Sequence, residues 1–213
     1  MIKKSPKKSV NKTIKKKPVK SRLCQNKKAN FNIVLDLDNT LISSLTKEEY
    51  ENRKTNKNIK FTSVCDGLYY TIARPHLDEF LTFIFKNFQV SVWTAATKDY
   101  AIEILNKFII KGKKERKLKS FLYDYHCEDS IDKINPNTPK DLRYLYLSKN
   151  KKFNKDNTII VDDHKDVIKN NKNNVIDSKY FDANKKNPLQ DTFLLNLIRD
   201  LKIVHQTLCS KEN

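Results

Sequence analysis

Long apolar runs are missing from this chain of 213 residues. No stretch approaches the roughly 18 apolar residues that a helix needs to cross a bilayer, and no apolar signal-peptide segment follows the basic residues at its start. The sequence therefore predicts a soluble, intracellular protein with no membrane partner. Its hydrophobic content of 38% is too high for a fully disordered chain, so most of it is expected to fold.

Paired cysteines are also missing. Cys24, Cys65, Cys127 and Cys209 are far apart and form no Cys-x-x-Cys motif, which excludes the usual sequence signatures of a zinc site and of a redox pair. His164 stands beside two aspartates, but no second histidine is clustered with it. A zinc site is therefore not predicted there either.

Acidic residues are absent from the first 28 residues, which hold twelve lysines and arginines and so carry +12 of the formal net charge of +18. Because this segment also lacks apolar periodicity and contains two prolines, we expect residues 1–28 to be a disordered basic tail. Four interpretations remain open: a solvated tail, a nuclear import signal, an arm that contacts nucleic acid or another polyanion, and a mitochondrial targeting segment. Its single arginine weakens the last, so the nucleus is expected ahead of the mitochondrion.

Apolar, strand-like runs alternate with amphipathic segments over residues 29–213, which predicts one α/β domain with a mostly parallel sheet. Residues 42–58 are polar and predict a loop with a helical turn or two, whereas Asp66-Gly67 predicts the turn of a hairpin over 59–74. The expected strands are 31–38, 88–95, 121–127, 157–163 and 174–177, and the expected helices are 76–88, 98–110, 139–147 and 188–208.

Three of the apolar runs end in polar residues. The first ends in Asp36 and Asp38, the second in Thr94, and the third in Asp162 and Asp163. In a parallel sheet, the carboxyl ends of the strands meet at a topological switch point where ligands bind. We therefore expect these side chains to lie close together.

Four carboxylates at one sheet edge repel one another, by about 4 kcal/mol for a pair 4 Å apart at an effective dielectric near 20. They predict a bound cation, and a set of oxygen donors favours Mg²⁺. A carboxylate beside a metal-held phosphate can attack phosphorus to give an aspartyl-phosphate, and a second, protonated carboxyl can serve the leaving oxygen and then activate water. Thr94 can bind a phosphate oxygen, and Lys140, at the start of an expected helix, can neutralise charge in the transition state.

Six blocks of this sequence resemble the haloacid dehalogenase superfamily and, within it, the small phosphatases that act on the C-terminal domain of RNA polymerase II. The blocks are DLDNTLISS at 36–44, ARPHLDEFL at 73–81, VWTAATKDYAIEIL at 92–105, KDLRYL at 140–145, IIVDDHKDVIKNNKNNVI at 159–176 and YFDANKKNPLQDTFLLNLIRDL at 180–201. The resemblance implies a Rossmann-like phosphatase domain over residues 29–213, with helices flanking a mostly parallel sheet and a small β-hairpin insert.

The resemblance also implies a role for each candidate. Asp36 would be the nucleophile and Asp38 the general acid/base. Thr94 would bind the phosphate, and Lys140 would hold the phosphoryl group.

The implied Mg²⁺ site shares two of these residues, Asp36 and the backbone carbonyl of Asp38. Asp163 would complete the site, and Asp162 would either share or support that role.

No large cap domain fits into the intervals 41–73 and 97–139, which hold only a hairpin and a basic segment at 111–119. An open site suits a phosphorylated macromolecule, so we expect a phosphoserine/phosphothreonine protein phosphatase, with the RNA polymerase II tail as a candidate substrate. Segment 111–119 is either a solvated loop or a surface for an acidic partner.

Two alternatives remain. The basic tail suggests a phosphatase of nucleic-acid ends, whose binding would weaken steeply with salt. The other is a non-catalytic binding scaffold of the same fold, as in some relatives in the mitochondrial import machinery. The intact candidate residues count against the scaffold.

Overall fold

The computed structural model describes residues 28–53, 59–148 and 152–211. The predicted basic tail lies outside the described residues, except for Lys28. No helix of the described part is long and apolar enough to cross a membrane.

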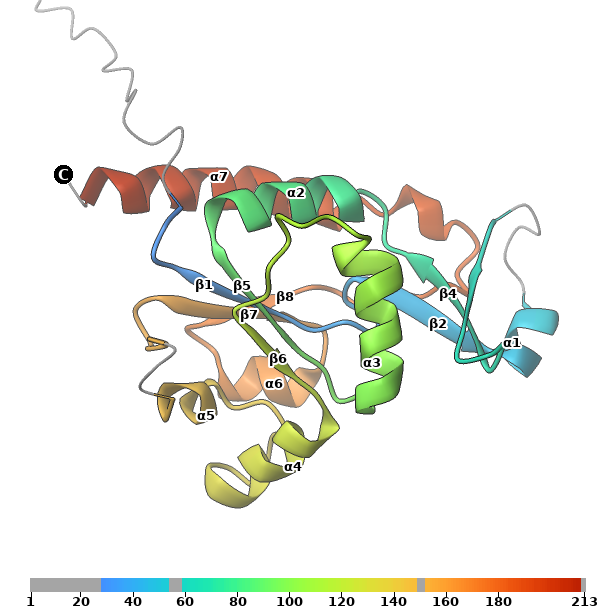
Figure 1. Ribbon diagram of the computed structural model, residues 1–213, viewed down its shortest axis with the longest axis horizontal. Helices are drawn as coiled ribbons and strands as arrows, with labels where there is room; N and C mark the ends of the chain where they lie inside the picture. The colour runs from blue at the N-terminus through green and yellow to red at the C-terminus, as the bar shows by residue number, and fades with distance from the viewer. Residues whose placement is uncertain (1–27, 54–58, 149–151, 212–213) are drawn as a thin grey trace, which may run out of the picture.

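Five parallel strands form the central sheet, in the order β6-β5-β1-β7-β8 (Figure 1). Leu35 of β1 aligns with Val92 of β5 on one side and with Val161 of β7 on the other. The chain builds outward from β1 in one direction and later returns to add β7 and β8 on the other side, so the topological switch point lies at β1. The strands are β1 (Asn32–Leu35), β5 (Gln89–Trp93), β6 (Ser120–Leu122), β7 (Thr158–Asp162) and β8 (Val175–Asp177).

Helices cover both faces of this sheet, which is why its strands are nearly continuous apolar runs. Ile33 and Leu35 of β1 belong to the core under α2, α3 and α7, whereas Val34 belongs to the core on the opposite face. The first layer comprises α2 (Leu77–Asn87), α3 (Lys98–Ile104), its π-helical continuation η2 (Leu105–Ile110) and α7 (Phe193–Lys211). The second comprises α4 (Asp124–Lys133), α5 (Leu142–Tyr146) and α6 (Lys165–Asn170).

A small antiparallel sheet follows β1, in the order β2-β4-β3. It contains β2 (Ile42–Thr46), β3 (Thr62–Val64) and β4 (Tyr69–Ala73), with the short helix α1 (Lys47–Glu51) after β2. The predicted hairpin is confirmed as β3 and β4, and Gly67 in its turn has φ +88°, a conformation that strains other residues. Within the described residues no large cap domain is present.

The predicted loop over 42–58 is wrong in its first part, because residues 42–46 form β2. Ser43 and Ser44 interrupt the apolar pattern of this strand, so the sequence did not predict it. Ser43 is buried and its hydroxyl accepts a hydrogen bond from the backbone of Ala183 at 2.9 Å, so a polar residue occupies a core-facing position without cost.

Three boundaries differ from those predicted, two of them around α4 and α5 and the third at the start of α7. The strand predicted over 121–127 ends at Leu122, and α4 begins at Asp124. The helix predicted from Pro139 begins at Leu142, because the Asp141 carboxylate caps it by accepting from the backbone of Arg143.

The last helix begins at Phe193 rather than at Pro188. Its first turn is preceded by Asp191, whose carboxylate accepts from the backbone of Phe193 at 2.9 Å. Pro188 instead begins a short 3₁₀ helix, η4 (Pro188–Gln190).

The basic segment 111–119 is partly structural. Arg116 is only 2% exposed and donates to the carbonyl of Ile109 and to the carboxylate of Asp78, which Lys113 also contacts. Two of its cations therefore tie this connector to the start of α2, which weakens the prediction of a free basic surface.

Arg74 joins the small sheet to the start of the C-terminal region. Its buried guanidinium makes two 2.8 Å hydrogen bonds to the Asp191 carboxylate and donates to the carbonyls of Thr40 and Lys179. Burial by itself would raise the pKa of Asp191, but the Arg74 hydrogen bonds hold it below its usual range.

We predict that Asp191→Asn lowers the free energy of unfolding at neutral pH by about 2 kcal/mol. Removing one partner of a fully buried pair costs about 3–5 kcal/mol, and we discount this because the Asp191 side chain is 24% exposed. Since the folded-state pKa is depressed, the stabilisation is present above the unfolded pKa and is lost as pH falls through the folded one. Urea titrations should therefore show a smaller difference from the natural protein in acid. The exposed α7 variant Asp200→Asn is the control, and equal stability of Asp191→Asn and the control would contradict the prediction.

Candidate active site

The predicted site residues lie together at the carboxyl edge of the central sheet. The backbone N–H of Asp36 donates to Val161 of β7 at 3.0 Å, and that of Thr94 donates to Leu122 of β6 at 3.1 Å, so both residues continue the strand ladders. A pocket of about 300 Å³ opens there. Its walls include all six predicted residues, namely Asp36, Asp38, Thr94, Lys140, Asp162 and Asp163.

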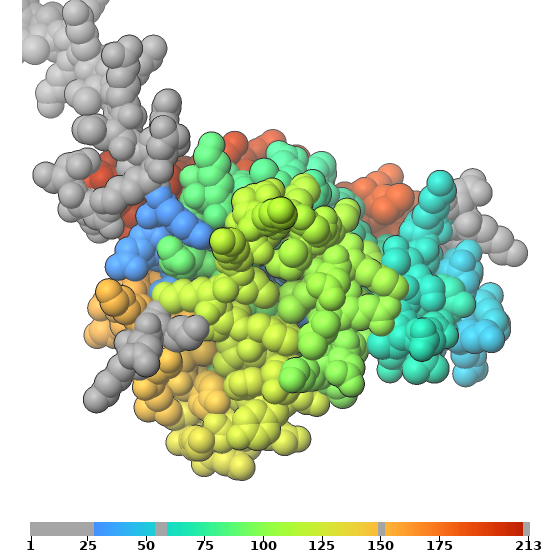
Figure 2. All heavy atoms as spheres, in the orientation of Figure 1, coloured from blue at the N-terminus to red at the C-terminus, as the bar shows by residue number. Residues whose placement is uncertain are grey.

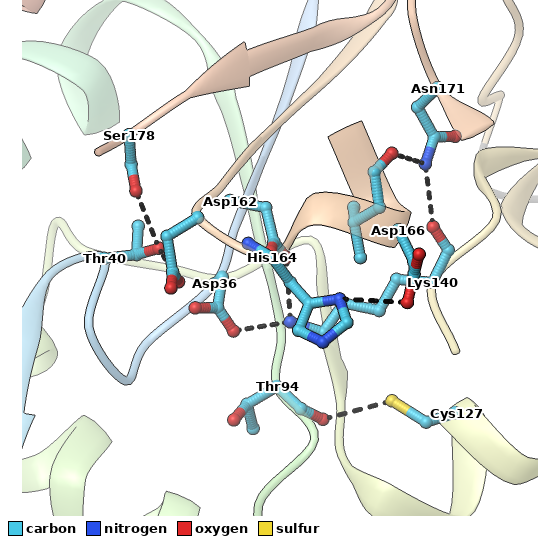
Figure 3. A network of polar contacts seen from close by, with 12 residues as sticks. Asp36, Thr40, Thr94, Cys127, Lys140, Asp162, His164, Asp166, Asn171 and Ser178 are labelled. Atoms are coloured by element: carbon cyan, nitrogen blue, oxygen red, sulfur yellow. Dashed lines mark hydrogen bonds and ion pairs between the residues drawn. The ribbon is translucent and has the colours of Figure 1, made fainter. Parts of the chain in front are cut away.

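Lys140 bridges two carboxylates that come from different strands (Figure 3). Its Nζ lies 2.5 Å from Oδ1 of Asp36 and 2.9 Å from Oδ2 of Asp162, and all three side chains are at most 8% exposed. Burial would lower the pKa of Lys140, but the two carboxylates raise it above its usual value, so the lysine is a cation. Burial raises the pKa of Asp36, and the Lys140 charge opposes that rise.

Asn171 positions the backbone of Lys140. Its side-chain amide donates to the Lys140 carbonyl at 2.9 Å and accepts from the backbone of Leu142 at 3.0 Å. The asparagine belongs to a polar segment of the sequence and carried no signal there, because its partners lie about thirty residues earlier in the chain.

Thr40 orients the carboxylate of Asp163, the least buried of the three aspartates Asp36, Asp162 and Asp163. Its hydroxyl donates to Oδ1 of Asp163 at 3.0 Å and lies 3.1 Å from the hydroxyl of Ser178. The Thr40 carbonyl accepts from Arg74 at 3.0 Å. The loop that follows β1 is thus fixed both to the end of β7 and to the small sheet.

Three carboxylates form a group that fits a divalent cation. Asp36, Asp162 and Asp163 each offer an oxygen atom, and these atoms lie within 4.8 Å of one another. Oxygen donors alone suit a hard ion such as Mg²⁺, which keeps several waters and takes few protein ligands. His164 is outside this group, since its ring is exposed and faces Asp166.

The Asp38 carboxylate is not part of this group and contacts Tyr100 of α3. The Tyr100 hydroxyl donates to Oδ1 of Asp38 at 2.6 Å and also lies 2.7 Å from the hydroxyl of Ser44, which contacts Thr71 at 2.8 Å. Burial raises the pKa of Asp38, and the Tyr100 hydrogen bond offsets only part of that rise. A carboxyl with a raised pKa is suited to hold and donate a proton.

Tyr100 is the main functional candidate that the sequence did not reveal. The sequence predicted a helix over residues 98–110 but no functional role for this tyrosine, which is buried against the core of the first helix layer. Helical periodicity identifies the inward face, but it cannot show that the hydroxyl of a core tyrosine reaches a carboxylate 62 residues earlier.

Thr94 is 1% exposed and is held in place from two sides. Its hydroxyl oxygen accepts from the backbone of Ala96 at 3.1 Å, and its carbonyl accepts from the Cys127 thiol at 3.5 Å. Because the hydroxyl oxygen is already an acceptor, its own hydrogen can be directed to a phosphate oxygen in the pocket.

Comparisons with known proteins point to one family. Residues 31–209 match the family model of the NLI interacting factor-like phosphatases. Two proteins described as CTD phosphatase-like protein 355R are each 38% identical to this chain. The one from invertebrate iridescent virus 3 aligns over 80% of this chain and 94% of its own length, and the one from invertebrate iridescent virus 6 over 70% and 85%.

A solved structure supports the fold alone. The structure of Fcp1, described as an essential RNA polymerase II CTD phosphatase, superposes with a TM-score of 0.58 at 20% identity. The match covers 86% of this chain and 64% of the Fcp1 chain, so this chain spans less than two thirds of that protein's length.

We predict that Lys140→Met destabilises the metal-free protein by about 3–5 kcal/mol, because it leaves two buried carboxylates without a counter-charge. Added Mg²⁺ should recover part of this loss, since a cation that binds only the folded state stabilises it. Urea unfolding with EDTA or with Mg²⁺ measures both effects. The exposed lysine variant Lys169→Met should show no loss in EDTA and should gain no more from Mg²⁺ than the natural protein does. A Lys140→Met protein as stable in EDTA as this control would contradict the prediction.

Proposed function

We propose that this chain, which belongs to the NLI interacting factor-like phosphatase family, is a Mg²⁺-dependent phosphatase that acts through an aspartyl-phosphate on Asp36. The observation that carries the proposal is the buried Asp36 carboxylate, held 2.5 Å from Lys140 in the pocket that Asp38 and Thr94 also line. The residues proposed as nucleophile, general acid, hydrogen-bond donor to the phosphate and fixed cation thus all line one pocket.

In the first step, a carboxylate oxygen of Asp36 forms a bond to phosphorus as the bond from phosphorus to the leaving oxygen breaks. Asp38 gives its proton to that oxygen. In the second step, Asp38 takes a proton from water, which attacks the acyl phosphate and frees Asp36. Lys140 and Thr94 hold the phosphoryl oxygens throughout.

The metal would be held by Asp36, Asp162, Asp163 and the backbone carbonyl of Asp38. When bound, Mg²⁺ supplies positive charge that offsets the carboxylates and the phosphate. The protein's own part is to place these oxygens at one sheet edge. Apart from the exposed His164, Lys140 is the one basic residue among the described residues that line the pocket, so it alone balances the negative charge of the carboxylates there.

The proposed substrate is a phosphoserine or phosphothreonine in a protein. The absence of a large cap domain from the described residues leaves the pocket open beside the small sheet, which suits a macromolecule. The descriptions of the viral relatives as CTD phosphatase-like and of Fcp1 as an RNA polymerase II CTD phosphatase support the RNA polymerase II tail as one candidate. No observation in the described residues favours a nucleic-acid end, which rested on the basic tail.

We predict that the protein hydrolyses para-nitrophenyl phosphate only with Mg²⁺ and that Asp36→Asn lowers kcat by about 10³-fold or more, as expected for loss of a nucleophile. Asp200→Asn, on the exposed face of α7, is the control, and thermal melting should confirm that both variants fold. Folded natural protein without turnover over a range of pH and metals would instead favour the non-catalytic scaffold.

We predict that Tyr100→Phe lowers kcat/KM for phosphoserine by about 10–100-fold, because Asp38 loses the contact that orients it as general acid. The ratio kcat/KM reports only the steps through formation of the aspartyl-phosphate, and para-nitrophenolate leaves readily without a proton, so kcat/KM for its phosphate should change by less than about threefold. Comparing kcat/KM on the two substrates separates orientation of Asp38 as acid from general damage to the fold. Tyr146→Phe on α5 is the matched control, and an equal loss on both substrates would contradict this role for Tyr100.

A further inference from the structure

The active-site pocket of about 300 Å³ is called the phosphate pocket below. A second, larger cavity of about 600 Å³ opens beside it, between the small sheet and the start of α3. We call it the side groove. It shares Asp38, Ala95 and Ala96 with the phosphate pocket, so the two spaces adjoin. Figure 2 shows the small sheet, in blue and cyan, next to α3, in yellow-green. A segment whose phosphate reaches Asp36 can therefore extend into this groove.

The charge of the side groove is opposite to that of the chain. Whereas the whole protein carries +18, three carboxylates and no lysine, arginine or histidine line the groove among the residues that the structure describes. Asp38 is already engaged by Tyr100. The other two, Glu49 and Asp99, are exposed, and neither is paired with a cation within the described residues.

Glu49 and Asp99 also lie in the first turn of a helix, where a negative charge is favoured by the helix dipole, and this explains part of their placement. One oxygen of Glu49 accepts from the backbone of Thr46 at 2.7 Å and completes a capping box in α1. That role does not require a charge, since glutamine serves equally in a capping box. A neutral, isosteric replacement can therefore separate the capping role of Glu49 from its charge.

Another part of the lining of the side groove is apolar and aromatic. Leu68, at the tip of the hairpin, is 66% exposed, and Tyr69 is 36% exposed. The side chain of lysine or arginine places an apolar stem before its charge, and an aromatic ring next to a carboxylate can contact both parts. The groove thus combines the two surfaces that such a side chain needs.

We propose, on the basis of the proposed phosphatase function, that the side groove selects phosphorylated protein segments that carry a lysine or arginine close to the phosphorylated residue. The phosphate is attracted to Lys140, while the neighbouring cation is attracted to Glu49 and Asp99. The same carboxylates repel a second phosphate in the groove, so a segment with one phosphate and a flanking cation is a better substrate than a densely phosphorylated one.

The test compares kcat/KM for phosphoserine peptides that differ only in the flanking residues, which are arginine, glutamine, glutamate or a second phosphoserine. Exposed ion pairs are weak individually, so we expect the arginine peptide to exceed the glutamate peptide by about tenfold at low salt and by less as salt screens the charges. The second phosphoserine should give the slowest turnover.

The decisive variant is the double substitution Glu49→Gln/Asp99→Asn, which keeps the capping oxygen and removes both charges. It should reduce the arginine preference to less than about twofold while leaving para-nitrophenyl phosphate turnover unchanged. The matched control is Glu115→Gln/Asp200→Asn, which changes the net charge equally at two exposed positions outside the groove. The control should keep the full preference.

Equal kcat/KM for the arginine and glutamate peptides would overturn the proposal, as would a preference that the groove variant retains or that the control loses to the same extent. Failure of the phosphatase function itself is recognised separately, by the absence of para-nitrophenyl phosphate turnover. In that case, the affinities of the same peptides for the Asp36→Asn protein test the groove without any chemistry. The arginine peptide should still bind more tightly, and equal affinities would overturn the proposal.

Discussion

The contact of Lys140 with both Asp36 and Asp162 is the interaction on which the rest of the site depends. Three charges are buried at the end of two adjacent strands, and none of them would be stable there alone. The lysine backbone is fixed by Asn171, and the two aspartates are fixed because they continue the ladder of β1 and end β7. The parallel sheet therefore does more than support the site, since its register sets the separation of the carboxylates that a cation must balance.

The small sheet is connected to the same centre by hydrogen bonds rather than by apolar packing alone. Ser44 of β2 lies between Thr71 of β4 and Tyr100 of α3, and Tyr100 donates to Asp38. Residues of this sheet thus line the side groove. The hydrogen bonds of Ser44 also connect the sheet, through Tyr100, to Asp38, the proposed general acid. Selection of a substrate segment and orientation of that carboxyl rest on one set of elements.

Much of this arrangement followed from the sequence because its signals are local. Apolar runs predicted β1, β5 and β7, the rule for parallel strands predicted that Asp36, Thr94 and Asp162 would meet, and Asp66-Gly67 predicted the hairpin. Missed features depend on distant partners. Ser43 could occupy a buried strand position only because the backbone of residue 183 donates to it, and the reach of the Tyr100 hydroxyl depends on how α3 packs against the loop after β1.

The most direct test of the central claim is to locate the phosphoryl group on the protein. Asp38→Asn protein, in which attack by water should be slowed, would be mixed with Mg²⁺ and para-nitrophenyl phosphate, quenched in acid and digested for peptide mass spectrometry. We expect one phosphoryl group on the Asp36 side chain, and none when Asp36 is also replaced by asparagine. A phosphoryl group on another residue, or turnover with no labelled protein at any time after mixing, would contradict Asp36 as the nucleophile.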